Sequence, residues 1–188
     1  DMIGFKANRI SFISEESISP NLRWLILTNN HLPQIPKSIG KCSRLQKLML
    51  AGNRLTSLPE EMRNCKNLEL LRISANQFEI LPEWLFTLRK LSWVALAGNP
   101  CSPSFSSFNL AEIDWKHLVI KEKLGEGASG NIYKAHRNNE DKEPIAVKVF
   151  KGEITSDGFP SDEMIATISV GTNPNLVKVI GKICNHPE

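Results

Sequence analysis

Three closely spaced glycines and a lysine further along form the part of this sequence best suited to chemistry. Gly125, Gly127 and Gly130 make a Gly-x-Gly-x-x-Gly pattern. Glycines let backbone N–H groups approach phosphate oxygens without an intervening side chain. Lys148 follows in a β-branched run, where strand alternation places Ala146 and Lys148 on the same face. The pattern indicates a site that holds the phosphates of a nucleotide.

Two kinds of local structure could present these glycines. A dinucleotide-binding turn requires an amphipathic helix directly after the last glycine, whereas residues 131–135 (Asn-Ile-Tyr-Lys-Ala) are typical of a strand. The sequence therefore favours a glycine-rich β-hairpin. The alternative is an ordinary glycine-rich turn followed by an unrelated strand with a surface lysine.

At these positions the sequence resembles the beginning of a protein kinase catalytic domain, through the three glycines, Ile132 and the Ala-Val-Lys that ends at Lys148. The resemblance implies that Leu124 and Ile132 contact the adenine of ATP from above, and that Ala146 leaves room beneath. It also implies that Lys148 holds the α- and β-phosphates. The ATP-binding residues predicted in this way are Leu124, Gly125, Glu126, Gly127, Ala128, Ser129, Gly130, Asn131, Ile132, Ala146 and Lys148.

A short helix is expected after the lysine strand. Ser161 can cap a helix over residues 162–170, and Gly171 can end it. Glu163 lies in the first turn of this helix, where the helix dipole alone favours a carboxylate. The resemblance implies more, because kinases have a helical glutamate here that pairs with the strand lysine and orients it. We therefore predict that Glu163 pairs with Lys148.

The motifs that carry out phosphoryl transfer in kinases do not occur in this sequence. It contains neither a His-Arg-Asp nor an Asp-Phe-Gly, which supply the catalytic base and the Mg²⁺ ligands in that family. We therefore assign no catalytic residue in this chain. The resemblance implies ATP and Mg²⁺ as cofactors, with the Mg²⁺ ligands outside this chain. We expect a fragment of an active enzyme that is inactive by itself.

Four segments in the first part of the chain repeat at an interval of 23 residues. Their first leucines are Leu22, Leu45, Leu68 and Leu91, and their asparagines are Asn30, Asn53, Asn76 and Asn99. A preceding half-repeat places Asn8 in the asparagine position. The pattern Leu-x-x-Leu-x-Leu-x-x-Asn-x-Leu resembles the leucine-rich repeat, in which neighbouring coils bury each other's apolar residues. We expect the asparagines to satisfy backbone groups as a ladder.

Each repeat continues with a second shared segment that begins at a proline. Pro36, Pro59 and Pro82 are predicted to begin short elements on the convex side. Cys42 and Cys65 occupy equivalent positions after them, which indicates buried apolar residues rather than metal ligands or a disulfide. The 23-residue length with Leu-Pro resembles the intracellular class of these repeats.

Alternate strand residues of the repeats are expected to point to the concave face, which is then too apolar to be wholly solvated. The predicted protein-binding surface consists of Trp24, Ile26, Met49, Leu70, Arg72 and Trp93. The same face is expected to include Lys6, Thr28, Lys47, Ala51, Ser74, Ala95 and Ala97. The two tryptophans are the expected anchors for a protein partner or substrate. The alternative is that further repeats or the following domain cover these side chains.

The composition narrows the classes of partner and the compartment. The net charge is +3 and no run of basic residues is interleaved with aromatics, so we expect no nucleic-acid partner. No apolar run approaches the ~18 residues that a membrane span requires. The sequence also contains no Asn-x-Ser/Thr glycosylation acceptor. Together with the repeat class, these features predict a cytoplasmic protein.

The sequence therefore predicts an α+β chain with a repeat: a leucine-rich-repeat solenoid followed by a partial protein-kinase N-lobe with an antiparallel sheet and one helix. About 4.5 repeats occupy residues 1–104, a linker occupies 105–117 and the lobe occupies 118–188. The approach at residues 113–118 resembles that of tyrosine-kinase-like serine/threonine kinases. The predicted function is an ATP-dependent protein serine/threonine kinase whose repeats bind protein. The alternative is a non-enzymatic scaffold with a kinase remnant.

Overall fold

The computed structural model describes residues 1–102, 111–127, 129–138, 143–151, 154–155, 157–169 and 174–187. The chain forms two compact units, Asp1–Ser104 with Ile154–Asp162, and Phe105–Glu153 with Glu163–Glu188. Each unit is described by itself. In the part of the chain that the structure describes, no helix has the length and apolar character needed to cross a membrane.

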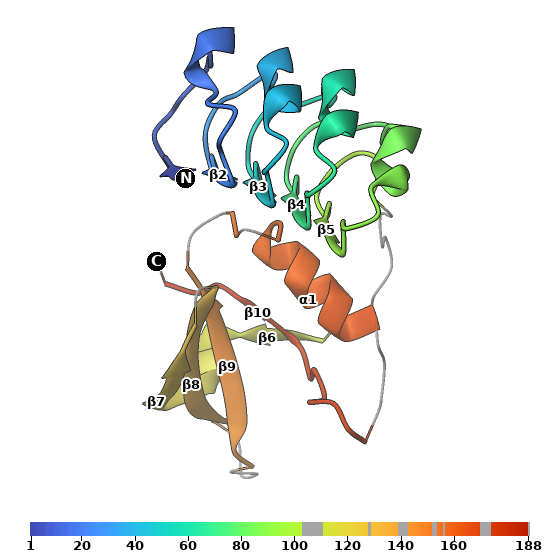
Figure 1. Cartoon of the computed structure of the whole chain (residues 1–188). Helices are drawn as coiled ribbons and strands as arrows, with labels where there is room; N and C mark the ends of the chain where they lie inside the picture. The colour runs from blue at the N-terminus through green and yellow to red at the C-terminus, as the bar shows by residue number, and fades with distance from the viewer. Residues whose placement is uncertain are drawn as a thin grey trace. The chain divides into compact units, whose positions relative to one another are not determined.

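The repeats form one parallel sheet, whose strands lie side by side in chain order (Figure 1). The strands are β1 (Met2–Gly4), β2 (Trp24–Ile26), β3 (Lys47–Met49), β4 (Leu70–Arg72) and β5 (Trp93–Ala95). Neighbouring strands pair at equivalent positions of successive repeats, so that Trp24 pairs with Lys47 and Leu70 with Trp93. Equivalent side chains therefore form rows across the sheet. The predicted repeat architecture is confirmed.

Short 3-10 helices form the convex side of the coils, as Figure 1 shows. They are η1 (Glu15–Ser17), η2 (Lys37–Lys41), η3 (Glu60–Asn64) and η4 (Glu83–Thr87). Pro36, Pro59 and Pro82 directly precede the last three, with φ angles of −65°, −64° and −69°. Proline suits this position because its ring fixes φ near this value and a missing N–H costs nothing at a helix start. The predicted role of these prolines is confirmed.

A continuous apolar core fills the coils between the sheet and the 3-10 helices. The middle residues of β2, β3 and β4 belong to it: Leu25 is 3% exposed, and Leu48 and Leu71 have no exposed surface. Cys42 and Cys65 are fully buried, as predicted, and both are free thiols. Burial raises the pKa of the Cys65 thiol to about 12, with a smaller contribution from Cys42. These thiols therefore serve as small apolar core groups.

The asparagine ladder is present and follows one pattern in each coil. Asn53 Nδ2 donates to the carbonyl oxygens of Leu27 at 3.0 Å and Leu50 at 2.8 Å, and its Oδ1 accepts from the Leu32 N–H at 3.0 Å. Each of the four ladder asparagines is at most 8% exposed. Asn8 differs because it is exposed and its Nδ2 donates to the Lys6 carbonyl. The sequence pattern thus predicts the ladder but not its weaker first member.

The second unit contains an antiparallel sheet of β7 (Leu118–Glu126), β8 (Gly130–Arg137) and β9 (Ile145–Phe150). Among the described residues of this sheet, the buried apolar side chains are few, namely Leu118, Ala135 and Val147. A separate pair of parallel strands joins β6 (Glu112–Asp114) to β10 (Lys182–Cys184), with η5 (Trp115–His117) after β6. The helix is α1 (Pro160–Ser169).

Two local expectations differ from the structure. The helix begins at Pro160 rather than at residue 162, so Ser161 lies inside its first turn and is not the cap. Instead, Asp162 Oδ2 accepts a hydrogen bond from the Phe159 N–H at 2.7 Å. The stretch predicted as a linker, residues 105–117, contains the strand β6, which pairs in parallel with β10. A partner strand distant in sequence fixes this pairing, which local patterns cannot reveal.

Candidate functional site: the glycine hairpin and the repeat face

Strands β7 and β8 form the predicted glycine hairpin. Gly125 pairs with Ile132 and Glu126 with Asn131, and the Gly127 N–H donates to the Gly130 carbonyl at 2.9 Å. An irregularity in β7 around Leu124 shifts the register before the turn. Ala128, which was predicted to bind ATP, lies outside the described residues. The segment is therefore a strand–turn–strand unit and not a strand–turn–helix unit.

The three glycines have different structural roles. At Gly130, an added Cβ would lie 2.5 Å from the Val149 carbonyl oxygen, so packing against β9 explains this glycine. At Gly125 and Gly127, an added Cβ would meet no atom of the described residues within 4 Å, and neither glycine has a positive φ. Packing and backbone conformation therefore do not require these two glycines. An open backbone of this kind suits the close approach of a ligand.

One row of residues crosses the three strands of this sheet. Gly125 pairs with Ile132, and Ile132 pairs with Lys148 on β9. Ala146 is two residues before Lys148 and therefore on the same face, while Val147 is 3% exposed on the opposite, core face. The expected alternation is therefore present. Leu124 and Ile132, the residues expected to contact adenine, are 57% and 37% exposed.

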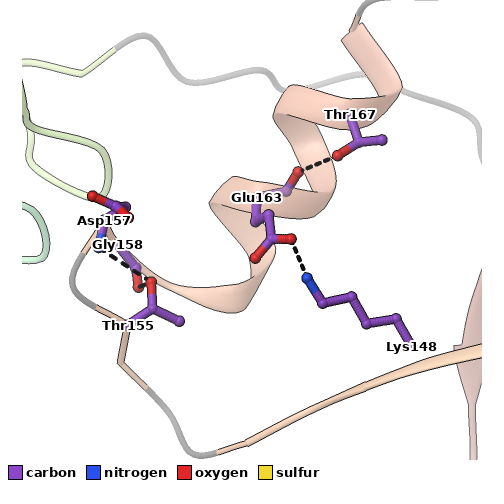
Figure 2. Close-up of polar contacts among 6 residues, drawn as sticks. All are labelled: Lys148, Thr155, Asp157, Gly158, Glu163 and Thr167. Atoms are coloured by element: carbon purple, nitrogen blue, oxygen red, sulfur yellow. Dashed lines mark hydrogen bonds and ion pairs between the residues drawn. The ribbon is translucent and has the colours of Figure 1, made fainter. Parts of the chain in front are cut away.

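Lys148 and Glu163 form an ion pair between β9 and α1 (Figure 2). Lys148 Nζ also lies 4.8 Å from the centroid of the Phe150 ring. Glu163 is held within the helix, where its carbonyl accepts from Thr167 Oγ1 at 2.8 Å. The predicted pair is thus present, and it joins a strand lysine to a helical carboxylate fifteen residues away in sequence.

Glu126, at the end of β7, has a set of contacts that the sequence did not predict. Its carboxylate pairs with Lys123 and with Lys151. Hydrogen bonds from these two ammonium groups, followed by their charges, lower the pKa of Glu126 to about 2. The Lys151 N–H also donates to the Ser129 carbonyl at 2.9 Å. The side-chain oxygen of Asn131 is buried and has no hydrogen-bond partner among the described residues.

A pocket lined by Glu112, Ile113, His117 and Arg137 lies at the open end of the β7–β8 hairpin, because His117 directly precedes β7 and Arg137 ends β8. It does not coincide with the glycine turn. Among the described residues, no group of three or more histidine, cysteine or acidic side chains is placed to hold a metal ion.

On the repeat sheet, the predicted protein-binding residues combine aromatic rings with cations. Lys47 Nζ lies 4.0 Å from the centroid of the Trp24 ring, and Arg72 Cζ lies 6.0 Å from that of Trp93. Trp93 is 53% exposed, while Trp24, Ile26, Met49, Leu70 and Arg72 are half-buried. Three other residues that were expected on this face, Thr28, Ala51 and Ser74, are buried.

Comparisons with known proteins identify the first part of the chain. Two families described as leucine-rich repeats match residues 21–42 and 43–100. Among 37 matching chains of solved structures, one is an LRR protein of Leptospira interrogans, 31% identical, with a TM-score of 0.50. That match covers 52% of this chain and 25% of the other. No curated protein matches.

A second solved structure is the LRR ectodomain of the receptor kinase SOBIR1 from Arabidopsis thaliana. It is 32% identical with a TM-score of 0.38, and the match covers 43% of this chain and 45% of the other. This chain thus spans less than half the length of either structure.

Proposed function

We propose that this chain, which is a leucine-rich-repeat protein with a protein-binding repeat domain, belongs to a cytoplasmic ATP-dependent protein serine/threonine kinase. In this proposal the glycine hairpin and Lys148 hold ATP, and the repeats hold a protein partner or substrate. The observation that carries the proposal is the Lys148–Glu163 ion pair between β9 and α1. A helix dipole explains an acidic residue in the first turn, but it does not explain contact with a strand lysine.

The open glycines support ATP as the ligand. Gly125 and Gly127 leave backbone accessible where no packing requires it, and Lys148 belongs to the same cross-strand row as Gly125. A phosphate group can approach such a backbone, and an ammonium group held by a carboxylate offers it a fixed positive charge. Bound ATP would supply the phosphoryl group. Ligands for Mg²⁺ and the catalytic base must then come from outside this sequence.

Nucleotide binding by this chain tests the proposal. A fluorescent ATP analogue titrated against the wild-type chain is expected to bind saturably, and Lys148→Met is expected to weaken binding about tenfold or more through the loss of a charge-assisted contact. Lys134→Met is the matched control, because Lys134 lies on the neighbouring strand and pairs with Glu122 instead. Absence of saturable binding, or equal loss in both variants, would contradict the proposal.

Phosphoryl transfer in the full-length protein separates the enzyme from a repeat scaffold. Glu163→Gln removes the negative charge that holds Lys148, so we expect transfer to fall well below that of wild type. The measurement is incorporation of labelled phosphate into a generic protein substrate. Wild-type activity in the Glu163→Gln variant would contradict the role of Glu163, and no activity in the wild type would favour the scaffold.

A further inference from the structure

Residues 154–162 belong to the same compact unit as the repeats, although they follow them far along the chain. Three of these residues meet three consecutive repeats. Ile154 lies at Gly52 of the repeat that contains β3, Asp157 at Arg72 on β4, and Phe159 at Gly98 of the repeat that contains β5. The segment therefore runs across the repeats, one contact to each.

The two apolar contacts occur at equivalent corners of the repeats. Gly52 and Gly98 each directly precede a ladder asparagine and have φ angles of +69° and +73°. A Cβ added to Gly52 would lie 2.9 Å from Ile154 Cγ2, and one added to Gly98 would lie 2.7 Å from Phe159 Cδ2. Larger side chains at these corners would displace the segment. The glycines thus leave room for one apolar side chain each.

The central contact is electrostatic. Arg72 Nε lies 3.1 Å from Asp157 Oδ1, although this N–H makes no aligned hydrogen bond. The Arg72 side chain is 21% exposed, so water screens this pair less than it screens a fully solvated one. Arg72 also lies beside the Trp93 ring. Both residues belong to the surface predicted to bind protein.

The segment is folded into a turn of its own (Figure 2). The Thr155 N–H and Oγ1 both donate to the Gly158 carbonyl at 2.8 Å, and the Asp157 N–H donates to Thr155 Oγ1 at 3.3 Å. Gly158 has a φ of +136°, which a residue with a side chain rarely adopts. A turn that is already formed loses little conformational entropy when it binds a surface.

We infer that the repeat face around Arg72 and Trp93 is a binding site for an acidic turn flanked by apolar residues, and that this chain occupies the site with its own residues 154–159. The arginine selects the carboxylate, and the glycine corners on either side accept the flanking apolar side chains. A partner with the same chemistry must displace this segment to bind. The inference is independent of nucleotide binding, so the two proposals can fail separately.

A labelled peptide of residues 154–162 tests this inference on the full chain. The wild-type chain is expected to bind it weakly, because its own segment competes. Asp157→Arg in the chain weakens that competitor, and affinity for the peptide should rise about tenfold if the segment covers the face nine-tenths of the time. Arg72→Asp should abolish binding, and a peptide with arginine in place of Asp157 should then bind the Arg72→Asp chain.

The control variant is Lys47→Asp, which changes another cation of the repeat sheet, one that lies over the Trp24 ring. It should leave the affinity for the peptide as in wild type. Circular dichroism checks that each variant is folded, and Arg72→Gln replaces Arg72→Asp if the latter is not. Equal affinity of the wild-type and Asp157→Arg chains, or unchanged binding after loss of the Arg72 charge, would overturn the inference.

Discussion

The repeats and the glycine hairpin use their side chains in opposite ways. In the repeats, the strands β2, β3 and β4 each place a leucine in the core, and the ladder asparagines bond to backbone groups. Leu48 is buried, and Asn53 is buried and hydrogen-bonded. In the hairpin unit, by contrast, Val147 is one of only three buried core residues in the described part. Ile132 and Lys148 lie in a row that the core does not use. This row is therefore available for a role other than packing.

Because of this difference, we expect the largest loss of stability from substitutions in the asparagine ladder. Asn53→Ala removes hydrogen bonds to the backbone groups of Leu27, Leu32 and Leu50, which remain buried. Unsatisfied buried groups cost about 1–3 kcal/mol each, so we expect a loss of about 3 kcal/mol or more in the free energy of unfolding. Chemical denaturation followed by circular dichroism measures it.

Asn8→Ala provides the matched control for that prediction. Asn8 has the same place in the repeat pattern, but it is exposed and its side chain donates to the Lys6 carbonyl. We expect this variant to lose much less stability than Asn53→Ala. Equal losses of stability in the two variants would show that the buried hydrogen bonds of Asn53 contribute no more than the exposed hydrogen bond of Asn8.

The sequence was sufficient to predict the repeats because one local pattern occurs several times. The 23-residue interval of leucines and asparagines predicts the register of neighbouring coils. The strands pair at this same interval, since Trp24 pairs with Lys47. The Lys148–Glu163 pair could be predicted only through the resemblance to kinases, since no local pattern joins a strand lysine to a later helix. The different roles of the three glycines could not be predicted, because they depend on how closely β9 approaches each glycine.

Substitution of single glycines is expected to separate packing from ligand access within the hairpin. Gly130→Ala places a Cβ 2.5 Å from the Val149 carbonyl oxygen, and the resulting backbone shift should cost about 1–3 kcal/mol. The Cβ added by Gly125→Ala meets no atom of the described residues within 4 Å. This variant should therefore keep nearly the stability of wild type while binding the ATP analogue more weakly. Thermal unfolding with nucleotide titration checks both variants. A destabilised Gly125→Ala chain would contradict the assigned difference.

Hydrogen exchange compares the two units directly. Amide protons of β3 and β4 lie above a core with no exposed surface at Leu48 and Leu71, whereas the β7–β9 sheet covers a much smaller core. Local opening is easier where fewer apolar side chains are buried. We expect exchange in β7–β9 to be faster by an order of magnitude or more. Equal protection from exchange in both units would show that the smaller core does not make local opening of β7–β9 easier.

Two contacts could not be predicted because their partners are distant in sequence and neither belongs to a repeated pattern. Asp157 meets Arg72 through a turn that the chain forms after β9. Glu126 meets Lys151 because β7 and β9 both end beside the glycine turn. A charge in a sequence gives no indication of its partner until the strands are placed. The repeats avoid this problem, since their partners recur at a fixed interval.

The smallest effect on stability is expected at Glu126, whose carboxylate forms ion pairs on the surface of the hairpin unit. Lys123 and Lys151 hold the pKa of this carboxyl at about 2, below its ordinary value of 4.5. Because the pKa is lower in the folded chain, the pair stabilises the fold above pH 4.5, and this contribution is lost as the pH falls towards 2. Carbon NMR titration of the Glu126 carboxylate measures the midpoint.

Lys151→Gln should raise that midpoint towards 4.5, and added salt should do the same, because an exposed ion pair is screened. Lys134→Gln is the control, since Lys134 pairs with Glu122 and should leave Glu126 unchanged. The effect on unfolding should be far smaller than that of Asn53→Ala, because a solvated carboxylate that loses its partner regains water. Removal of a buried asparagine leaves its backbone partners without a hydrogen bond or water, so we expect the repeats to tolerate substitution less well than the hairpin surface.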